Sequence, residues 1–393
     1  MKFAKRLEWC DSSDVGDILK ALSDPEILSL AGGLPAPELF PVEEVKTATA
    51  FVLDREGDKA LQYSSAQGDP RLREMVARRM TDKYGTPAKA EEVLITNGSQ
   101  QALDMAGKVF LEEGSVVLCE SPTYLGALGA FRTYGAEFVG VETDSDGMII
   151  EDLERKLKEI DDVRLVYVNP DFQNPTGIDW SVERRKAFAE VVGRYGVAAI
   201  EDNPYGELRF EGPCPPSIKS FDRAGVVISL GSFSKIFSPG MRVAWMIAAP
   251  EILSKFGDMK QNAILCSSTL HQAQIVAYNE MFDLDAHVER ICKVYEKRMS
   301  VLIDSVREFF PKEAVVVPPA GGLFAWVELP EGVNAREVFK VAVEEHKVAF
   351  VPGGAFFAEP GHENYMRLNF SNVPEDRLRE GIRRLGAVLS QSV

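Results

Sequence analysis

The sequence predicts an α/β protein built around a mostly parallel, doubly wound sheet. Short apolar runs recur from residue 93 to residue 230, and a stretch long enough for a helix separates each from the next, which is the alternation that parallel sheets require. These runs lie at residues 93–96, 116–119, 165–168, 197–200 and 226–230. The chain has 393 residues, and 45% of them are hydrophobic, which is enough for a substantial core divided over two or three packed units.

Charge and composition exclude several classes of function. A formal net charge of -16 argues against a nucleic-acid partner, because proteins that bind phosphate backbones concentrate basic residues on one face. The five cysteines are widely spaced, without the paired spacing of zinc or redox sites, and we expect them to be reduced. Residues 1–10 lack the apolar core of a signal peptide, and no apolar run is long enough to span a bilayer, so we expect a cytoplasmic protein.

The amino-terminal third contains one expected helix and two loops of interest. Residues 14–22 have the apolar spacing of a short amphipathic helix. Residues 30–41 are too rich in glycine and proline for a helix or strand; the segment is either a linker or a place where paired glycines, including Gly33, let the backbone approach a ligand. The loop at 61–70 carries Tyr63, and a tyrosine in a loop is most often a half-buried packing residue.

A turn of small residues opens the helix expected after the strand at 93–96. Such a turn exposes free backbone N–H groups at the positive end of the helix dipole, which is a ready site for an anion. Gly98, Ser99 and Gln100 occupy this turn. Many α/β loops have the same composition, so the turn alone does not establish a phosphate site.

Polar and aromatic residues follow the next three strands, at the edge where ligands bind in open α/β sheets. Tyr124 offers either a ring that stacks on a flat ligand or ordinary core packing. Asn174 lies in Asn-Pro-Thr-Gly, which by composition alone predicts a turn. Asp202 can pair with a protonated ring nitrogen or cap a helix, and Tyr205, three residues later, can donate to the same ring edge.

The most specific stretch is 230–242, which follows the last of these strands. Ser232, Ser234 and Arg242 flank Lys235 at a spacing that can gather three donors around one phosphate. Lys235 is then a counter-charge, a solvated surface residue, or an amine that forms an imine with an aldehyde cofactor. Pyridoxal phosphate carries both the aldehyde and the phosphate.

The carboxyl-terminal part predicts a small α+β domain. After a strand at 243–249 the pattern is helical to residue 309, including a long helix around 288–306. Strands at 315–317, 321–328 and 365–370 and helices at 335–345 and 374–389 follow. Arg367 interrupts the last strand, and it is either solvent-facing or a bidentate clamp on a carboxylate.

The motif Ser-x-Ser-Lys-x-x-x-Pro-Gly-x-Arg, from Ser232 to Arg242, resembles the cofactor-lysine motif of class I/II aminotransferases, in the fold-type I pyridoxal phosphate family. The resemblance covers essentially the whole chain, and it is strongest to the subgroup of 2-aminoadipate, kynurenine and aromatic amino acid aminotransferases. The motifs that carry it begin at Ala31 (Ala-Gly-Gly-Leu-Pro), Gly98 (Gly-Ser-Gln-Gln), Phe172 (Phe-Gln-Asn-Pro-Thr-Gly) and Phe350 (Phe-Val-Pro-Gly-Gly). It implies an amino-terminal segment at 1–44, a large cofactor-binding domain at 45–290 and a small domain at 291–393.

The resemblance also implies roles for individual residues. Lys235 holds pyridoxal phosphate, Asp202 pairs with its ring nitrogen, and Tyr124 stacks on the ring. The phosphate is bound by Gly98, Ser99, Gln100, Ser232, Ser234 and Arg242. Asn174 and Tyr205 form hydrogen bonds with the phenolic oxygen of the cofactor, while Gly33, Asn174 and Arg367 contact the substrate. Tyr63 reaches across the interface of a homodimer to the neighbour's cofactor phosphate.

The implied reaction is ping-pong transamination from an amino acid to an oxo acid, with 2-oxoglutarate as the expected acceptor. Two alternatives stay open: a lyase or decarboxylase that uses the same imine, and the effector-binding domain of a transcription regulator. Such regulators carry a DNA-binding domain ahead of this fold, for which we expect no room here. Gly16 stands where relatives that accept acidic side chains often carry arginine, so apolar or aromatic donors are expected to exceed 2-aminoadipate, unless Lys20 substitutes.

Overall fold

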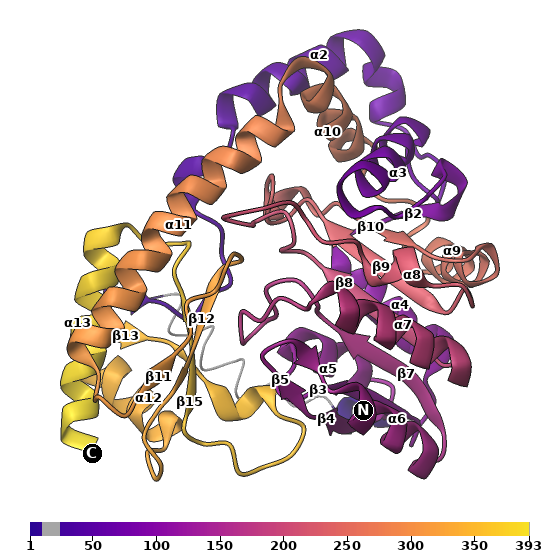
Figure 1. Cartoon of the computed structure of the whole chain (residues 1–393). Coiled ribbons are helices and arrows are strands. Elements are labelled where there is room, and N and C mark those ends of the chain that lie inside the picture. The colour runs from indigo at the N-terminus through magenta and orange to yellow at the C-terminus, as the bar shows by residue number, and fades with distance from the viewer. Residues whose placement is uncertain (10–23, 393) are drawn as a thin grey trace.

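A seven-stranded sheet forms the centre of the larger part of the molecule (Figure 1). The computed structural model describes residues 1–9 and 24–392. Six strands run in one direction and β10 is antiparallel to both of its neighbours. In spatial order the strands are β2 (Val93–Thr96), β10 (Ala244–Ile247), β9 (Val227–Ser232), β8 (Ala198–Asn203), β7 (Val163–Val168), β3 (Val116–Glu120) and β4 (Glu137–Val141).

Helices cover both faces of this sheet, which explains why its strands are continuous apolar runs. Along β3, Val117 and Cys119 face one layer while Val116 and Leu118 face the other. The first layer consists of α4 (Ser99–Phe110), α5 (Leu125–Arg132) and α9 (Pro250–Ile264). The second consists of α6 (Ile150–Glu159), α7 (Val182–Tyr195) and α8 (Ile218–Phe221). The predicted doubly wound, mostly parallel sheet is therefore confirmed.

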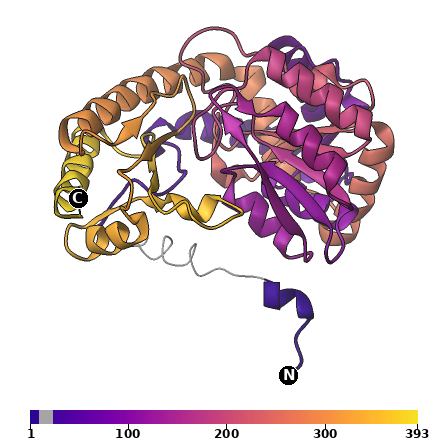
Figure 2. The same ribbon diagram turned by 60° about the horizontal axis from the view of Figure 1, so that its bottom comes forward.

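A smaller part contains a four-stranded antiparallel sheet. Its strands in order are β11 (Val315–Val316), β12 (Phe324–Glu328), β15 (Tyr365–Asn369) and β14 (Val351–Pro352). Helices α12 (Ala335–Glu344) and α13 (Glu375–Ser392) accompany it, and β1 (Leu28–Ser29) joins this part by pairing in parallel with β13 (Val348–Ala349). The long helix α11 (Leu284–Phe309) packs on α13 and connects the two parts, as Figures 1 and 2 show.

Three further helices, α2 (Val42–Ala60), α3 (Pro70–Tyr84) and α10 (Thr269–Met281), pack together beside β2. The boundaries of α3 follow from its sequence. The Asp69 carboxylate accepts the Arg71 N–H at 2.8 Å, Pro70 occupies the first turn, and Gly85 ends the helix with a positive φ of 61°. Shorter elements complete the chain: η1 (Lys5–Trp9), η2 (Pro37–Leu39), η3 (Ala90–Glu92), β5 (Thr143–Asp144), β6 (Gly147–Met148), η4 (Pro239–Met241) and η5 (Gly353–Phe356).

The structure extends two predicted strands and adds a strand at the edge of the sheet. Strand β8 continues past residue 200, so Asp202 lies inside the strand rather than after it. The preceding Glu201 is buried, and its carboxylate accepts the N–H groups of Ile218 and Lys219 at 2.6 and 3.1 Å. Strand β9 likewise includes Ser232. Strand β4 was not predicted, because it is a half-exposed edge strand with a short apolar run.

Several other expectations concern absences or positions that the structure does not describe. Within residues 1–9 and 24–392, no helix is long and apolar enough to cross a membrane, and no cluster of metal-binding side chains occurs. Cysteines 119, 214, 266 and 292 are free. The helix expected at 14–22, with Gly16 and Lys20, and also Cys10, lie outside the described residues.

Candidate active site

A cavity of about 550 Å³ lies at the carboxyl ends of β3, β7, β8 and β9, facing the smaller part. Twelve of the fourteen predicted site residues line it. They are Gly33, Ser99, Gln100, Tyr124, Asn174, Asp202, Tyr205, Ser232, Ser234, Lys235, Arg242 and Arg367. Because the four strands are neighbours in the sheet, residues more than 100 positions apart in the sequence, such as Tyr124 and Lys235, share one site.

One end of the cavity gathers hydrogen-bond donors around an open space. Ser232 Oγ lies 2.9 Å from Ser234 Oγ, and it accepts the Ser234 N–H at 3.0 Å. The exposed guanidinium of Arg242 crosses to the turn that opens α4, where it donates to the Asn97 carbonyl at 3.1 Å. Gly98 does not line the cavity itself, but it has a φ of 80° and a Cβ there would overlap Arg242. Glycine therefore lets the two halves of an anion site meet.

Lys235 projects into the middle of the cavity. Its Nζ donates to the carbonyl of Gly33 at 2.7 Å, and it has no ion-pair partner among the residues described. Burial, and next the nearby Arg367 and Arg242, lower the pKa of this amine to about 8. Both causes favour the neutral amine, which is the form that acts as a nucleophile or base.

Asp202 occupies the end of β8 with an asymmetric environment. One carboxylate oxygen, Oδ2, accepts a hydrogen bond from the Tyr167 hydroxyl at 2.9 Å. The other, Oδ1, is buried and has no partner among the described residues, although the side chain lines the cavity. Burial raises the pKa of this carboxyl to about 6, while the bond from Tyr167 lowers it. An unpaired buried oxygen that faces a cavity is suited to a cationic or N–H group of a ligand.

A hydrogen-bonded loop after β7 brings Asn174 beside Tyr205. The Asn174 side-chain amide lies 3.5 Å from the Tyr205 hydroxyl, and its backbone N–H donates to Asn169 Oδ1 at 2.8 Å. The Asn169 amide donates to the Asp202 carbonyl at 2.5 Å, so this side chain joins the loop to β8. The Asn169 N–H in turn donates to the buried carboxylate of Glu120 at 2.8 Å.

Arg367 reaches the cavity from β15, in the smaller part. Its two terminal nitrogens donate to Asn174 Oδ1 and to the Ala31 carbonyl, both at 2.7 Å. The guanidinium lies 4.2 Å from the centroid of the Phe324 ring, and burial lowers its pKa to about 10. A buried arginine without a carboxylate in the described part of the chain is suited to bind the carboxylate of a ligand.

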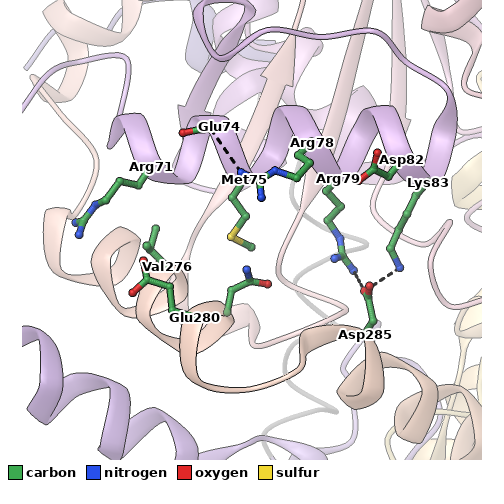
Figure 3. A pocket seen from close by; sticks show the side chains of 11 residues that line it. Arg71, Glu74, Met75, Arg78, Arg79, Asp82, Lys83, Val276, Glu280 and Asp285 are labelled. Carbon is green, nitrogen blue, oxygen red and sulfur yellow. Dashed lines mark hydrogen bonds and ion pairs between the residues drawn. The ribbon is translucent and has the colours of Figure 1, made fainter.

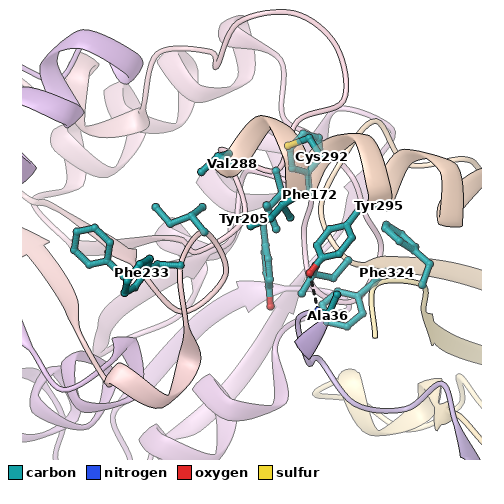
Figure 4. Packing of buried hydrophobic residues seen from close by; sticks show 14 of the residues in the cluster. Ala36, Phe172, Tyr205, Phe233, Val288, Cys292, Tyr295 and Phe324 are labelled. Carbon is teal, nitrogen blue, oxygen red and sulfur yellow. Dashed lines mark hydrogen bonds between the residues drawn. The ribbon is translucent and has the colours of Figure 1, made fainter. Parts of the chain in front are cut away.

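The segment that carries Gly33 is hydrogen-bonded to the connecting helix α11. Figure 4 shows the hydrophobic cluster that contains Tyr205 and Phe324, whose rings meet edge to face with centroids 5.8 Å apart. In the same view the Tyr295 hydroxyl of α11 accepts the Ala36 N–H, at 2.9 Å. The connecting helix therefore contributes to the position of the segment over the cavity.

Tyr63 is the predicted site residue that the structure leaves apart from the others. Its side chain is 76% exposed and does not line the cavity of its own chain. The exposure is consistent with contact to a second chain, and this role stays a prediction.

Several lining residues were missed by sequence analysis. Tyr167 and Asn169 form hydrogen bonds with the predicted residues, while Leu125, Phe324 and Val351 provide apolar walls. Tyr167 was counted only as part of an apolar strand. Its spacing of two residues from Asn169 places both side chains on one face of the strand, which is the pattern that could have found it.

A second cavity, of about 450 Å³, lies between α3 and α10, and Asp285 at the beginning of α11 also lines it (Figure 3). Five of its charged side chains form ion pairs with one another: Arg79 and Lys83 contact Asp285 at 2.7 and 2.8 Å, and Arg78 contacts Glu74 at 3.5 Å. No predicted site residue lines this cavity. The ion pairs connect α3 to α11, and we assign no ligand here.

The chain is similar to a known family of enzymes over most of its length. The family described as aminotransferase class I and II matches residues 26–385. The aromatic-amino-acid aminotransferase 1 of Thermococcus litoralis is 40% identical over an alignment of 395 residues, which covers 100% of this chain and 94% of that protein.

Two solved structures extend the comparison to the fold. The kynurenine aminotransferase of Pyrococcus horikoshii, solved in complex with PMP, has a TM-score of 0.94 and 39% identity, and the match covers 100% of this chain and 97% of that chain. The α-aminoadipate aminotransferase of Thermus thermophilus, complexed with N-(5'-phosphopyridoxyl)-L-leucine, has a TM-score of 0.91 and 42% identity, with 99% and 97% covered.

Proposed function

This chain belongs to the class I and II aminotransferases, and we propose that it moves the amino group of an aromatic or other apolar amino acid to an oxo acid, with 2-oxoglutarate as the acceptor. The observation that carries the proposal is the shared cavity of Lys235, Asp202 and Arg367. These side chains supply an amine, a carboxylate and a guanidinium, each without an ion-pair partner among the residues described. Pyridoxal phosphate needs an amine for its aldehyde and a carboxylate for its ring nitrogen, and an amino acid needs a cation for its α-carboxylate.

The cofactor of this family is pyridoxal phosphate, and the residues present fit it. The hydroxyls of Ser232 and Ser234, the Arg242 guanidinium and the first turn of α4 would hold the phosphate. The Ser99 hydroxyl in that turn is buried without a partner in the described chain, as expected for a group that binds a ligand. The unpaired Oδ1 of Asp202 would receive the ring nitrogen.

Bound pyridoxal phosphate supplies an aldehyde that accepts the amino group and a ring that withdraws electrons from the α-carbon. The chain itself supplies the proton transfer. Lys235 Nζ, whose pKa is lowered to about 8, can take the proton from the α-carbon of the amino acid and later return it. Asp202 would hold a proton on the ring nitrogen, and Tyr205 and Asn174, which lie side by side, would orient the ring through its phenolic oxygen.

Arg367 would orient the substrate through its α-carboxylate, because a planar guanidinium binds a carboxylate with two parallel hydrogen bonds. The contacts that it now makes with Asn174 and Ala31 fix its direction in advance. The remaining wall is apolar, with Leu125, Phe324 and Val351 lining the cavity. We infer that an apolar or aromatic side chain is favoured there over the distal carboxylate of 2-aminoadipate.

The finer organisation is proposed on the same basis. The amino-terminal segment 1–44, the cofactor domain 45–290 and the small domain 291–393 form one subunit of a homodimer. In the homodimer, the exposed Tyr63 of each subunit serves the neighbour's cofactor phosphate. We propose a location in the cytoplasm as well.

A single half-reaction tests the proposal. The holoenzyme is mixed with phenylalanine, leucine or 2-aminoadipate without an acceptor, and pyridoxamine phosphate and the oxo acid are quantified. We expect both products in equal amounts, one per active site, and the highest kcat/KM for phenylalanine or leucine. Release of carbon dioxide or of a cleaved side chain in place of pyridoxamine phosphate would establish a decarboxylase or lyase. A clear lead for 2-aminoadipate would show that another cation binds the distal acid.

A further inference from the structure

Tyr167 touches the acidic residue of the site but has no assigned role. It is the last residue but one of β7, its side chain is buried, and its ring meets Phe131 edge to face at 6.1 Å between centroids. The hydroxyl donates to Asp202 Oδ2 at 2.9 Å. Both side chains line the cavity, so the bond lies at the cavity wall and involves the same carboxylate whose free oxygen would meet the cofactor.

This hydrogen bond gives the two oxygens of the carboxylate different roles. Because Oδ2 is occupied by Tyr167, the free Oδ1 is left as the acceptor toward the cavity. The backbone of Asp202 is fixed separately, since its carbonyl accepts the Asn169 amide at 2.5 Å. The end of β7 and the residue after it therefore hold Asp202 by its side chain, through Tyr167, and by its main chain, through Asn169.

The Tyr167 hydroxyl is also the group that favours a charged Asp202. Tyr124, at the start of α5, and Tyr205, after β8, face Asp202 as well, but neither donates a hydrogen bond to it. The cations of the cavity are Lys235, Arg242 and Arg367; none of them makes an ion pair with Asp202 in the described part of the chain. Tyr167 itself faces Glu120, from the end of β3, and Tyr124.

We propose that Tyr167 is a positioning residue that aims the Asp202 carboxylate at the cofactor and keeps it ionised. The proposal rests on the proposed function, in which Asp202 pairs with the ring nitrogen. A carboxylate that receives a hydrogen bond binds a proton less tightly, so the proton between Asp202 and the ring nitrogen stays on the nitrogen. Without the Tyr167 bond the proton moves toward Asp202, and the ring becomes a weaker electron acceptor.

The test is Tyr167→Phe, which removes the hydroxyl and keeps the ring. Tyr134→Phe is the matched control, because the Tyr134 hydroxyl also donates to an aspartate, Asp104 on α4, at 2.7 Å, away from the cavity. The direct readout is the ¹⁵N chemical shift of ring-labelled cofactor in the holoenzyme, which reports protonation of that nitrogen. The second readout is the pH dependence of cofactor binding to the apoenzyme.

We expect Tyr167→Phe to move the ¹⁵N shift toward the unprotonated ring and to lower kcat by at least about tenfold. The acidic limb of cofactor binding should move to higher pH by about one unit or more, which is the scale of one hydrogen bond to a charged group. The direction follows because loss of a donor raises the pKa of the carboxyl. The control should leave the ¹⁵N shift and the acidic limb unchanged.

An unchanged ¹⁵N shift in Tyr167→Phe, with a normal unfolding midpoint, would overturn the proposal. Asp202→Asn separates this failure from failure of the proposed function. If Asp202→Asn moves the ¹⁵N shift and Tyr167→Phe does not, Asp202 keeps its role and Tyr167 has none. If neither variant moves it, Asp202 does not meet the ring nitrogen, and the assignment of the site fails with it.

Discussion

Replacement of Asp202 by asparagine should separate activity from stability. The change keeps the shape of the side chain and lets its amide oxygen accept the Tyr167 hydroxyl, but it removes the negative charge. Loss of one partner from a buried charge pair costs about 3–5 kcal/mol, and the neutral amide recovers a part of this. We therefore expect the holoenzyme to retain its cofactor while kcat falls by at least about 100-fold, or about 2.7 kcal/mol of activation free energy.

The cofactor-free protein should respond in the opposite direction. Burial raises the pKa of Asp202 from 3.8 to about 6, so the ionised carboxylate opposes folding at neutral pH. Stability from this group is complete below pH 3.8 and is lost as the pH rises through 6. The variant cannot ionise, so at pH 7 its apoprotein should gain up to about 3 kcal/mol of unfolding free energy.

Two assays follow from this pair of effects. Single-turnover kinetics with leucine measure proton abstraction in the holoenzyme, and urea unfolding measures apoprotein stability at pH 7 and pH 5. The stability difference between the two proteins should shrink as the pH falls below 6. Near-normal turnover in Asp202→Asn would refute the role of the carboxylate, and equal apoprotein stability at pH 7 would refute its burial in the ionised form.

Three other outcomes test the site. Reduction of the holoenzyme with borohydride, followed by peptide mapping, should place the cofactor on Lys235, and a label on a different lysine would refute the assignment. Subunit exchange between inactive Lys235→Ala and Tyr63→Phe proteins should restore about a quarter of the wild-type activity, because half of the dimers are mixed and each has one intact site; no recovery would contradict a shared site. Gly98→Ala should weaken cofactor binding at least about tenfold, because the new methyl overlaps Arg242. Gly212→Ala is its control, with a φ of 75° and no atom within 4 Å of the new methyl, and an equal loss in both variants would mean that backbone strain alone is responsible.

The fold class and the centre of the site could be predicted from the sequence because both depend on local patterns. Apolar runs separated by helix-length stretches predict a parallel sheet wherever they occur. The hydroxyls and guanidinium around Lys235 lie within one short stretch, 232–242, so their spacing carries the information directly. The resemblance to a known family then supplied the roles of residues that composition alone leaves ambiguous, such as Asn174.

Only the tertiary structure decided how distant residues meet. Apart from the family resemblance, nothing in the order of residues places Arg367 against Ala31 and Asn174, since its strand belongs to the smaller, four-stranded sheet. The partner of Asp202 was also hidden, because a tyrosine in an apolar strand looks like core, and its hydroxyl reaches a carboxylate only when β7 lies next to β8. Hydrophobic periodicity determines which face of an element is buried, whereas strand order determines which buried groups touch, and that order is a property of the folded chain.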